Sequence, residues 1–146
     1  MKNQYFGDIN DYRKYGLIRS ILRAGDFRLL VAWMLTPDDD SNDGNIVEYL
    51  AKPKQWKNFD PTLYEGLQRL MRPDARRSVG LIESASLLPS ANYYSRTVPD
   101  AAADRSQWMR DLIAASGISD LVFLDPDNGF EVKARPYGRK RSSKYV

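Results

Sequence analysis

One nearly continuous apolar run constrains the fold more than any other feature of this sequence. Residues 28–35 read RLLVAWML, with Gly-Asp shortly before the run and Thr-Pro directly after it. A run this short, without the regular polar positions of a surface helix, is typical of a strand that is buried on both faces. We therefore expect residues 28–35 to form the central strand of a largely parallel sheet.

Apolar residues at helical spacing alternate along the chain with shorter apolar segments. We expect helices at 9–24, 61–71 and 101–116, a short helical stretch at 46–50, and further strands at 79–82, 93–98 and 120–124. Asp60 before Pro61 is a good N-cap, and Asp8 or Asn10 can cap the first helix. This alternation predicts an α/β, Rossmann-like domain over residues 1–132, with about four mostly parallel strands and helices on both faces.

The last expected strand would lie at an edge of that sheet. An apolar edge strand exposes unpaired backbone groups, so it needs a partner. We expect either a second copy of the chain, giving a homodimer, or a further segment to cover it.

The composition excludes several classes of catalytic centre. The 146 residues include no Cys and no His, which excludes ordinary zinc sites, Ser-His-Asp and Cys-His centres, and disulfide scaffolds. No apolar segment is long enough for a membrane span, and the N-terminus lacks the apolar region of a secretory signal. We expect a cytoplasmic protein.

Charge is distributed unevenly along the chain. Residues 1–132 carry a net charge of −3, whereas residues 133–146 carry +6. A basic tail on a mildly acidic body favours contact with the phosphates of nucleic acid, although a solvated terminus fits the same charges.

Two polar loops follow the two most apolar strand segments. TPDDDSNDG comes after Leu35, and DPDNGFE comes after Leu124. In parallel α/β sheets, ligands bind beyond the carboxyl ends of the strands. If the two strands are parallel neighbours, both loops line one crevice, where Asn128 offers an amide donor and a carbonyl acceptor.

The segment LVFLDPDNGFE, residues 121–131, resembles motif IV of Rossmann-like S-adenosylmethionine-dependent methyltransferases that act on exocyclic amino groups. The N-terminal YFGDINDYRKYGLIRSIL is similar to the helix before the cofactor strand in ribosomal-RNA adenine methyltransferases. The chain departs from that class because it has no Gly-x-Gly after the first strand, and because Asp127 and Asn128 replace the second proline and the aromatic residue of motif IV. The chain also resembles, over most of its length, a family of uncharacterised bacterial and phage proteins with the YFGDINDYRKYG and DPDNG blocks.

The methyltransferase resemblance implies a role for each matching position. Asp125 and the Pro126 carbonyl would accept hydrogen bonds from a target amino group, with Asn128 beside them. The other implied roles are a stacking surface for a base at Phe130, binding of S-adenosylmethionine by Lys14 and one of Asp38, Asp39 and Asp40, and phosphate contacts from Lys140, Arg141 and Lys144.

Three alternatives remain open. Pro126-Asp127 with Glu131-Val132-Lys133 mimics elements of a Mg²⁺-dependent nuclease, although with unusual spacing. The aspartates at 38, 39, 40 and 43 form either a cation-binding or a solvated acidic loop. The third alternative is a non-catalytic module with a degenerate methyltransferase fold that binds nucleic acid or protein. Lys52, Lys54 and Lys57 interleave with Trp56, a pattern found in nucleic-acid-binding surfaces.

Overall fold

A computed structural model describes residues 1–146, and the chain folds into two compact units of mixed α/β structure. The sheet unit comprises Met1–Lys2, Phe27–Pro37 and Ser90–Val146. The helical unit comprises Asn3–Asp26 and Asp38–Pro89.

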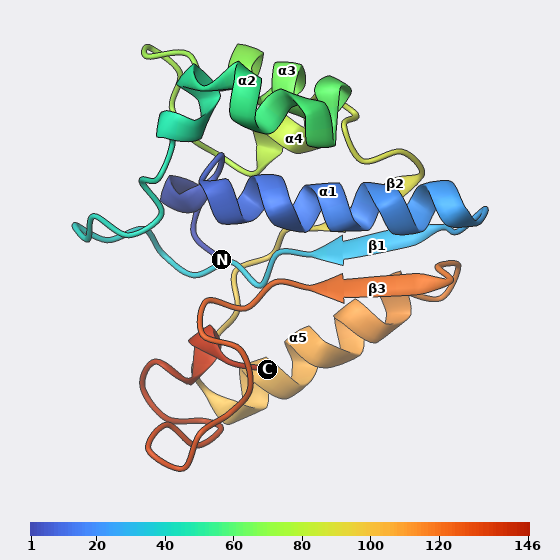
Figure 1. The fold of residues 1–146 in the computed structure, drawn as a ribbon. Coiled ribbons are helices and arrows are strands. Elements are labelled where there is room, and N and C mark those ends of the chain that lie inside the picture. The colour runs from blue at the N-terminus through green and yellow to red at the C-terminus, as the bar shows by residue number, and fades with distance from the viewer. The chain divides into compact units, whose positions relative to one another are not determined.

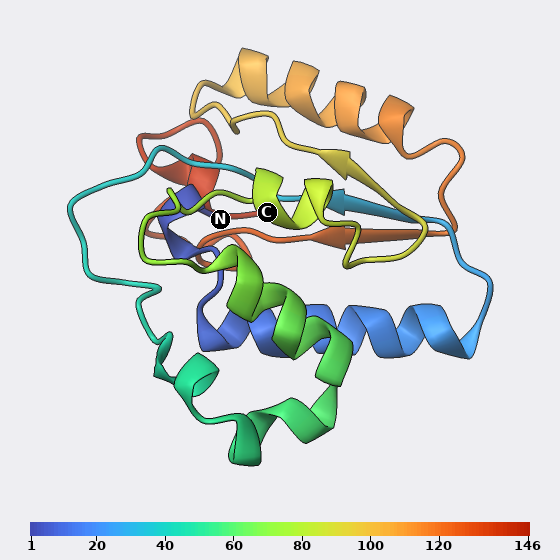
Figure 2. The same cartoon turned by 90° about the horizontal axis from the view of Figure 1, so that it is seen from above.

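The sheet unit contains a three-stranded parallel sheet in the order β2-β1-β3. Strand β1 (Leu29–Ala32) is buried at all four positions and pairs on one side with β2 (Ala91–Tyr94) and on the other with β3 (Leu121–Leu124). Figure 2 shows the blue β1 between the yellow β2 and the orange β3. The predictions of a central strand at this position and of a parallel neighbour at 120–124 are confirmed.

Helix α5 (Ala102–Ala115) connects β2 to β3 and covers one face of the sheet (Figure 1). Trp108 and Leu112 on this helix pack against alternate residues of β1, Leu30 and Ala32. Tyr94 of β2 meets Trp108 edge-on, with 5.3 Å between the ring centroids. The alternation along β1 thus directs one set of side chains to the α5 core.

The prediction of about four strands is wrong, because residues 79–82 are not a strand. Helix α4 (Gly80–Ser84) occupies this segment, and Ile82 is fully buried. A run of four apolar residues fits one helical turn as well as a strand, so periodicity alone cannot separate the two. The strand expected at 93–98 ends at Tyr94, with only an isolated bridge between Leu35 and Thr97 further along.

The basic segment 133–146 belongs to the sheet unit and is held by defined contacts. The Arg141 and Ser143 N–H groups donate to the carboxylate of Asp100, both at 2.8 Å. Burial acts to raise the pKa of Asp100, but these N–H bonds outweigh it and lower the pKa. The last residue pairs with the loop after β3, because the Val146 N–H donates to Gly129 O.

The helical unit begins with a 3-10 turn (Asn3–Tyr5), followed by α1 (Ile9–Ala24) at its predicted position. Asp8 rather than Asn10 is the N-cap, and its carboxylate also accepts from the Ile46 N–H at 2.9 Å. Gly7 has φ +82°, and a Cβ atom there would overlap the Met71 side chain. Much of the conspicuous N-terminal sequence block therefore shapes the start of α1.

The remaining helical elements lie between residues 48 and 84. They are 3-10 turns at Glu48–Ala51 and Lys57–Phe59, the one-turn helix α2 (Pro53–Trp56), α3 (Pro61–Leu70) and α4. Figure 1 shows α2 and α3 above α1 within this unit. The helix expected at 61–71 and its Asp60 N-cap are confirmed, since Asp60 accepts from the Leu63 N–H at 3.0 Å.

A buried ion pair joins α1 to the start of α3. Arg19 donates to Asp60 at 2.7 Å, and both side chains are under a tenth exposed. Arg23 adds a contact to the same carboxylate at 3.1 Å, and Arg19 also donates to the Leu87 carbonyl. Burial acts to raise the pKa of Asp60, but the Arg19 hydrogen bond and the Leu63 N–H outweigh it and lower the pKa.

None of the helices combines the length and apolar character needed to cross a membrane.

Replacing Asp60 with Ala should destabilise the protein by about 3–5 kcal/mol, because Arg19 would stay buried without a counter-ion. Urea denaturation measures this loss. Asp111→Ala, which breaks an exposed pair with Arg96, is the matched control and should change stability by about 1 kcal/mol or less. Equal losses in the two variants would contradict this assignment. Asp60→Asn provides a milder variant if the alanine protein does not fold.

The lowered pKa of Asp60 also predicts acid sensitivity. Its stabilising contribution is complete above the unfolded-state pKa of about 3.9 and is lost as the pH falls through the lower folded-state pKa. Unfolding measured from pH 6 downward should therefore show a smaller loss of stability in Asp60→Asn than in the parent protein. Parallel curves for the two proteins would contradict this role.

Candidate functional site

The loops that follow β1 and β3 meet within the sheet unit. The Thr36 hydroxyl donates to the Asp127 carboxylate at 2.7 Å, which joins the first residues of one loop to the other. The strand order 2-1-3 places β1 and β3 at the point where the chain order reverses. Ligands of open α/β sheets bind beyond the strand ends at such a switch point.

Three acceptors at these strand ends converge on one amino group, that of Met1. The Met1 nitrogen donates to Met34 O at 3.2 Å and to Asp125 O at 3.1 Å, and it lies 2.5 Å from the Asp127 carboxylate. The Met1 and Asp127 side chains are each 2 % exposed. The end of β3 therefore presents a carbonyl and a carboxylate that hold a nitrogen donor.

The predicted catalytic residues lie around this amino group in different environments. Asp125 is buried, at 7 % exposure, and Pro126 is partly buried. Asn128 is exposed, and its N–H donates to the Lys144 carbonyl at 2.9 Å. Asp127, for which the sequence suggested a role only in the nuclease alternative, accepts from the Thr36 hydroxyl and pairs with the Met1 amino group.

The predicted substrate-binding residues also lie in the sheet unit. Phe130 is 84 % exposed, and Lys140 and Arg141 are exposed as well. Lys144 is mostly buried, and its Nζ lies 3.7 Å from Asp127. Lys144 thus contributes to the strand-end cluster, whereas the other three are accessible from solvent.

The acidic loop forms a pocket with Gln4 in the helical unit. The Gln4 N–H donates to Asp38 at 3.1 Å, and the Gln4 side-chain carbonyl accepts from the Asp39 N–H at 2.7 Å. The cavity has a volume of about 360 Å³. Asp38, Asp39 and Ser41 line it together with Arg76 and Arg77, whereas Asp40 is exposed and is not among its lining residues.

The two arginines of this pocket differ in their hydrogen bonding and exposure. Arg77 donates to Phe6 O, Gly44 O and the Asn45 side chain, and burial lowers its pKa. Arg76 is exposed and brings a cation to the same cavity as Asp38. The pocket therefore offers charges of both signs. Arg76 was not identified from the sequence, since it lies in a polar stretch between helices.

Lys14, predicted to bind the cofactor, pairs with Asp11 one turn earlier on α1 at 2.9 Å. Both residues belong to α1, so this ion pair is intrahelical. Asp11 is buried and also accepts from the Gly7 N–H at 3.0 Å.

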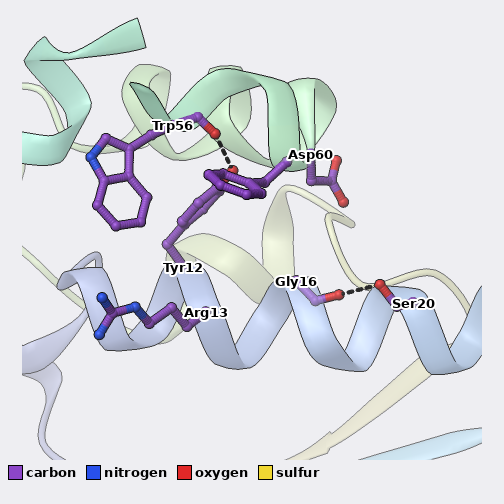
Figure 3. A pocket seen from close by; sticks show the side chains of 7 residues that line it. Tyr12, Arg13, Gly16, Ser20, Trp56 and Asp60 are labelled. Carbon is purple, nitrogen blue, oxygen red and sulfur yellow. Dashed lines mark hydrogen bonds between the residues drawn. The ribbon is translucent and has the colours of Figure 1, made fainter. Parts of the chain in front are cut away.

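A second, aromatic pocket lies between α1 and residues 56–60, with a volume of about 440 Å³ (Figure 3). Figure 3 shows Tyr12, Arg13, Gly16 and Ser20 along α1 and Trp56 and Asp60 opposite them. The Tyr12 hydroxyl donates to Trp56 O at 2.8 Å and fixes the ring, and burial raises the pKa of Tyr12. The basic and aromatic residues at 52–57 indicated this region in the sequence, but nothing indicated its partners on α1.

No group of three or more acidic side chains is arranged to hold a metal ion. Comparison with family models, curated proteins and solved structures gave no match to this chain.

Replacing Asp127 with Asn should lower stability by about 2–4 kcal/mol, because the Met1 ammonium would lose its buried counter-ion. Urea denaturation measures the change. Asp26→Asn, an exposed acid that no described contact involves, removes the same charge and should have little effect. An Asp127 variant as stable as the Asp26 variant would show that the ion pair contributes nothing.

Proposed function

We propose that this chain is a methyltransferase-like protein that binds an amino group of nucleic acid beyond the ends of β1 and β3, with S-adenosylmethionine as methyl donor. The observation that carries the proposal is the convergence of Met34 O, Asp125 O and the Asp127 carboxylate on an amino group. These acceptors match the chemistry that an exocyclic amino group requires. In this proposal the target amino group replaces that of Met1.

The acceptors would act on the nucleophile by orientation. A carbonyl and a carboxylate that each accept an N–H bond leave the nitrogen lone pair directed away from them and limit rotation of the amino group. Asp125 is buried and directly follows β3, which is paired with β1, so its carbonyl has a fixed position. The exposed ring of Phe130 supplies a stacking surface for the base, and Lys140 and Arg141 supply charges for its phosphates.

The acidic-loop pocket fits the amino-acid end of the proposed cofactor. That end carries one ammonium and one carboxylate, and Asp38 with Asp39 and Arg76 provide the complementary charges. When bound, the cofactor supplies an activated methyl group.

The non-catalytic binding module is the second candidate. Asp125 and the Asp127 side chain are both buried, and Asp127 is already bonded by Thr36 and Met1. In this candidate, the acceptors at the end of β3 only stabilise the fold. Nucleic acid would then bind to the exposed basic residues of the C-terminal segment.

Titration with S-adenosylmethionine should raise the melting temperature by several degrees at tenfold excess over Kd, because a ligand bound only to the folded state stabilises it. Asp38→Asn and Arg76→Gln should abolish the shift. The matched controls, Asp43→Asn and Arg72→Gln, change the same charges outside the pocket and should keep it.

A methyl-transfer assay with labelled cofactor and single-stranded RNA or DNA separates the two candidates. Asp127→Asn, in the folded protein, should keep the cofactor shift and reduce transfer at least tenfold, since it removes the carboxylate acceptor after β3. No shift and no transfer in the parent protein, together with salt-sensitive nucleic-acid binding lost in Lys140→Gln/Arg141→Gln, would overturn the enzyme in favour of the binding module.

A further inference from the structure

We infer that the aromatic pocket of the helical unit binds an unpaired nucleobase of a single-stranded nucleic acid. This site is separate from the proposed acceptor cluster, and every residue that lines it belongs to the helical unit. The inference does not depend on methyl transfer.

The shape and lining of the cavity favour a flat aromatic occupant. Tyr12, Trp56 and Phe59 supply rings, and Gly16 leaves space where other residues would place a side chain. Phe59 is 77 % exposed, and its ring lies 6.2 Å from that of Trp56. Adjacent accessible rings form the kind of surface on which bases stack.

The free charges at the rim are positive. Asp60, the only acid in the lining, has its two oxygens bonded by Arg19, Arg23 and the Leu63 N–H. Arg13 places its guanidinium 5.7 Å from the Trp56 ring centre. This carboxylate is therefore neutralised, while a cation lies at the mouth of the pocket.

Two more cations, Lys52 and Lys54, lie shortly before Trp56 in the chain. Lys52 and Lys54 are exposed and line a neighbouring cavity of about 360 Å³ with Gln55. Lys57 is paired with Glu65 at 2.5 Å, so its charge is balanced. A single strand could place a base in the aromatic pocket and its phosphates near Arg13, Lys52 and Lys54. The aromatic and basic groups together therefore fit a polyanion that carries aromatic bases.

The polar groups of the pocket predict weak base preference. The Ser20 hydroxyl donates to Gly16 O at 2.9 Å, and the Tyr12 hydroxyl donates to Trp56 O. With these donors used inside the protein, binding depends on stacking, which every base provides. The site should accept single strands of different sequence and reject duplexes, whose bases are already stacked.

The intrinsic fluorescence of the full chain provides the measurement. Trp33 and Trp108 are 0 % and 5 % exposed, whereas Trp56 is only partly buried and lines the pocket. Titration with a single-stranded oligonucleotide of mixed sequence should quench Trp56, and the duplex of the same sequence should bind at least tenfold more weakly. Equal affinity for both forms would overturn the inference.

Filling the cavity tests the site without removing a contact. The nearest atom to a Cβ atom built at Gly16 is a Leu63 methyl at 4.0 Å, so the first atom of a side chain fits there without a clash. Gly16→Leu should fill the pocket and reduce affinity at least tenfold, whereas Gly16→Ala should bind nearly as the parent protein does. A folded Gly16→Leu protein with parental affinity would refute the site.

Variants of an aromatic ring and of the lysines test base stacking and phosphate contact separately. Phe59→Ala should weaken binding about tenfold, whereas Phe27→Ala, another exposed ring outside the pocket, should not. Lys52→Gln/Lys54→Gln should reduce the slope of log K against log salt by about 1.4, and Arg69→Gln/Arg72→Gln should leave it unchanged.

Two further results would overturn the assignment. If Phe59→Ala and Lys52→Gln/Lys54→Gln bind like the parent protein, the oligonucleotide binds elsewhere. If an aromatic peptide quenches Trp56 and the oligonucleotide does not, the pocket recognises protein. Asp38→Asn alters the acidic-loop pocket and not the aromatic pocket, so this variant should keep oligonucleotide binding. The methyltransferase proposal and the nucleobase-binding inference can therefore fail independently.

Discussion

The burial of β1 is the constraint on which the rest of the sheet unit depends. All four of its residues are inaccessible, so its backbone N–H and C=O groups must be paired within the protein. Strands β2 and β3 satisfy one edge each, and α5 covers one face. The parallel direction of both partners then brings the residues after β1 and β3 to the same end of the sheet, where Thr36 meets Asp127.

The parts of the fold that the sequence predicted are those with long or strongly patterned signals. Helix α1 matches its expected bounds, and the Asp60-Pro61 pair marks the start of α3 because the cap and the fixed φ of proline act locally. The segment 79–82 was mistaken for a strand because four apolar residues carry no usable period. The division into two units was not foreseen, since it arises from contacts between residues far apart in the chain.

In the candidate sites too, features set by neighbouring residues were predictable, whereas contacts between residues far apart in the chain were not. The two acidic loops were found from the strands that precede them, and their first residues do meet. The ion pair between Met1 and Asp127 was not predictable, because 126 positions separate the two residues. Gly16 and Tyr12 carried only a helical signal, yet they line a pocket with Trp56, since α1 and the segment before α3 are joined through Arg19 and Asp60.

The interleaving of the two units has a consequence for synthesis on the ribosome. Leu29 pairs with Ala91 and with Leu121, so β1 emerges long before either partner strand exists. The helical unit is complete at Pro89, before β2 has been made. The nascent chain must therefore carry its most apolar segment without strand partners while the helices form, and this interval is when it is most open to wrong association or to capture by a chaperone.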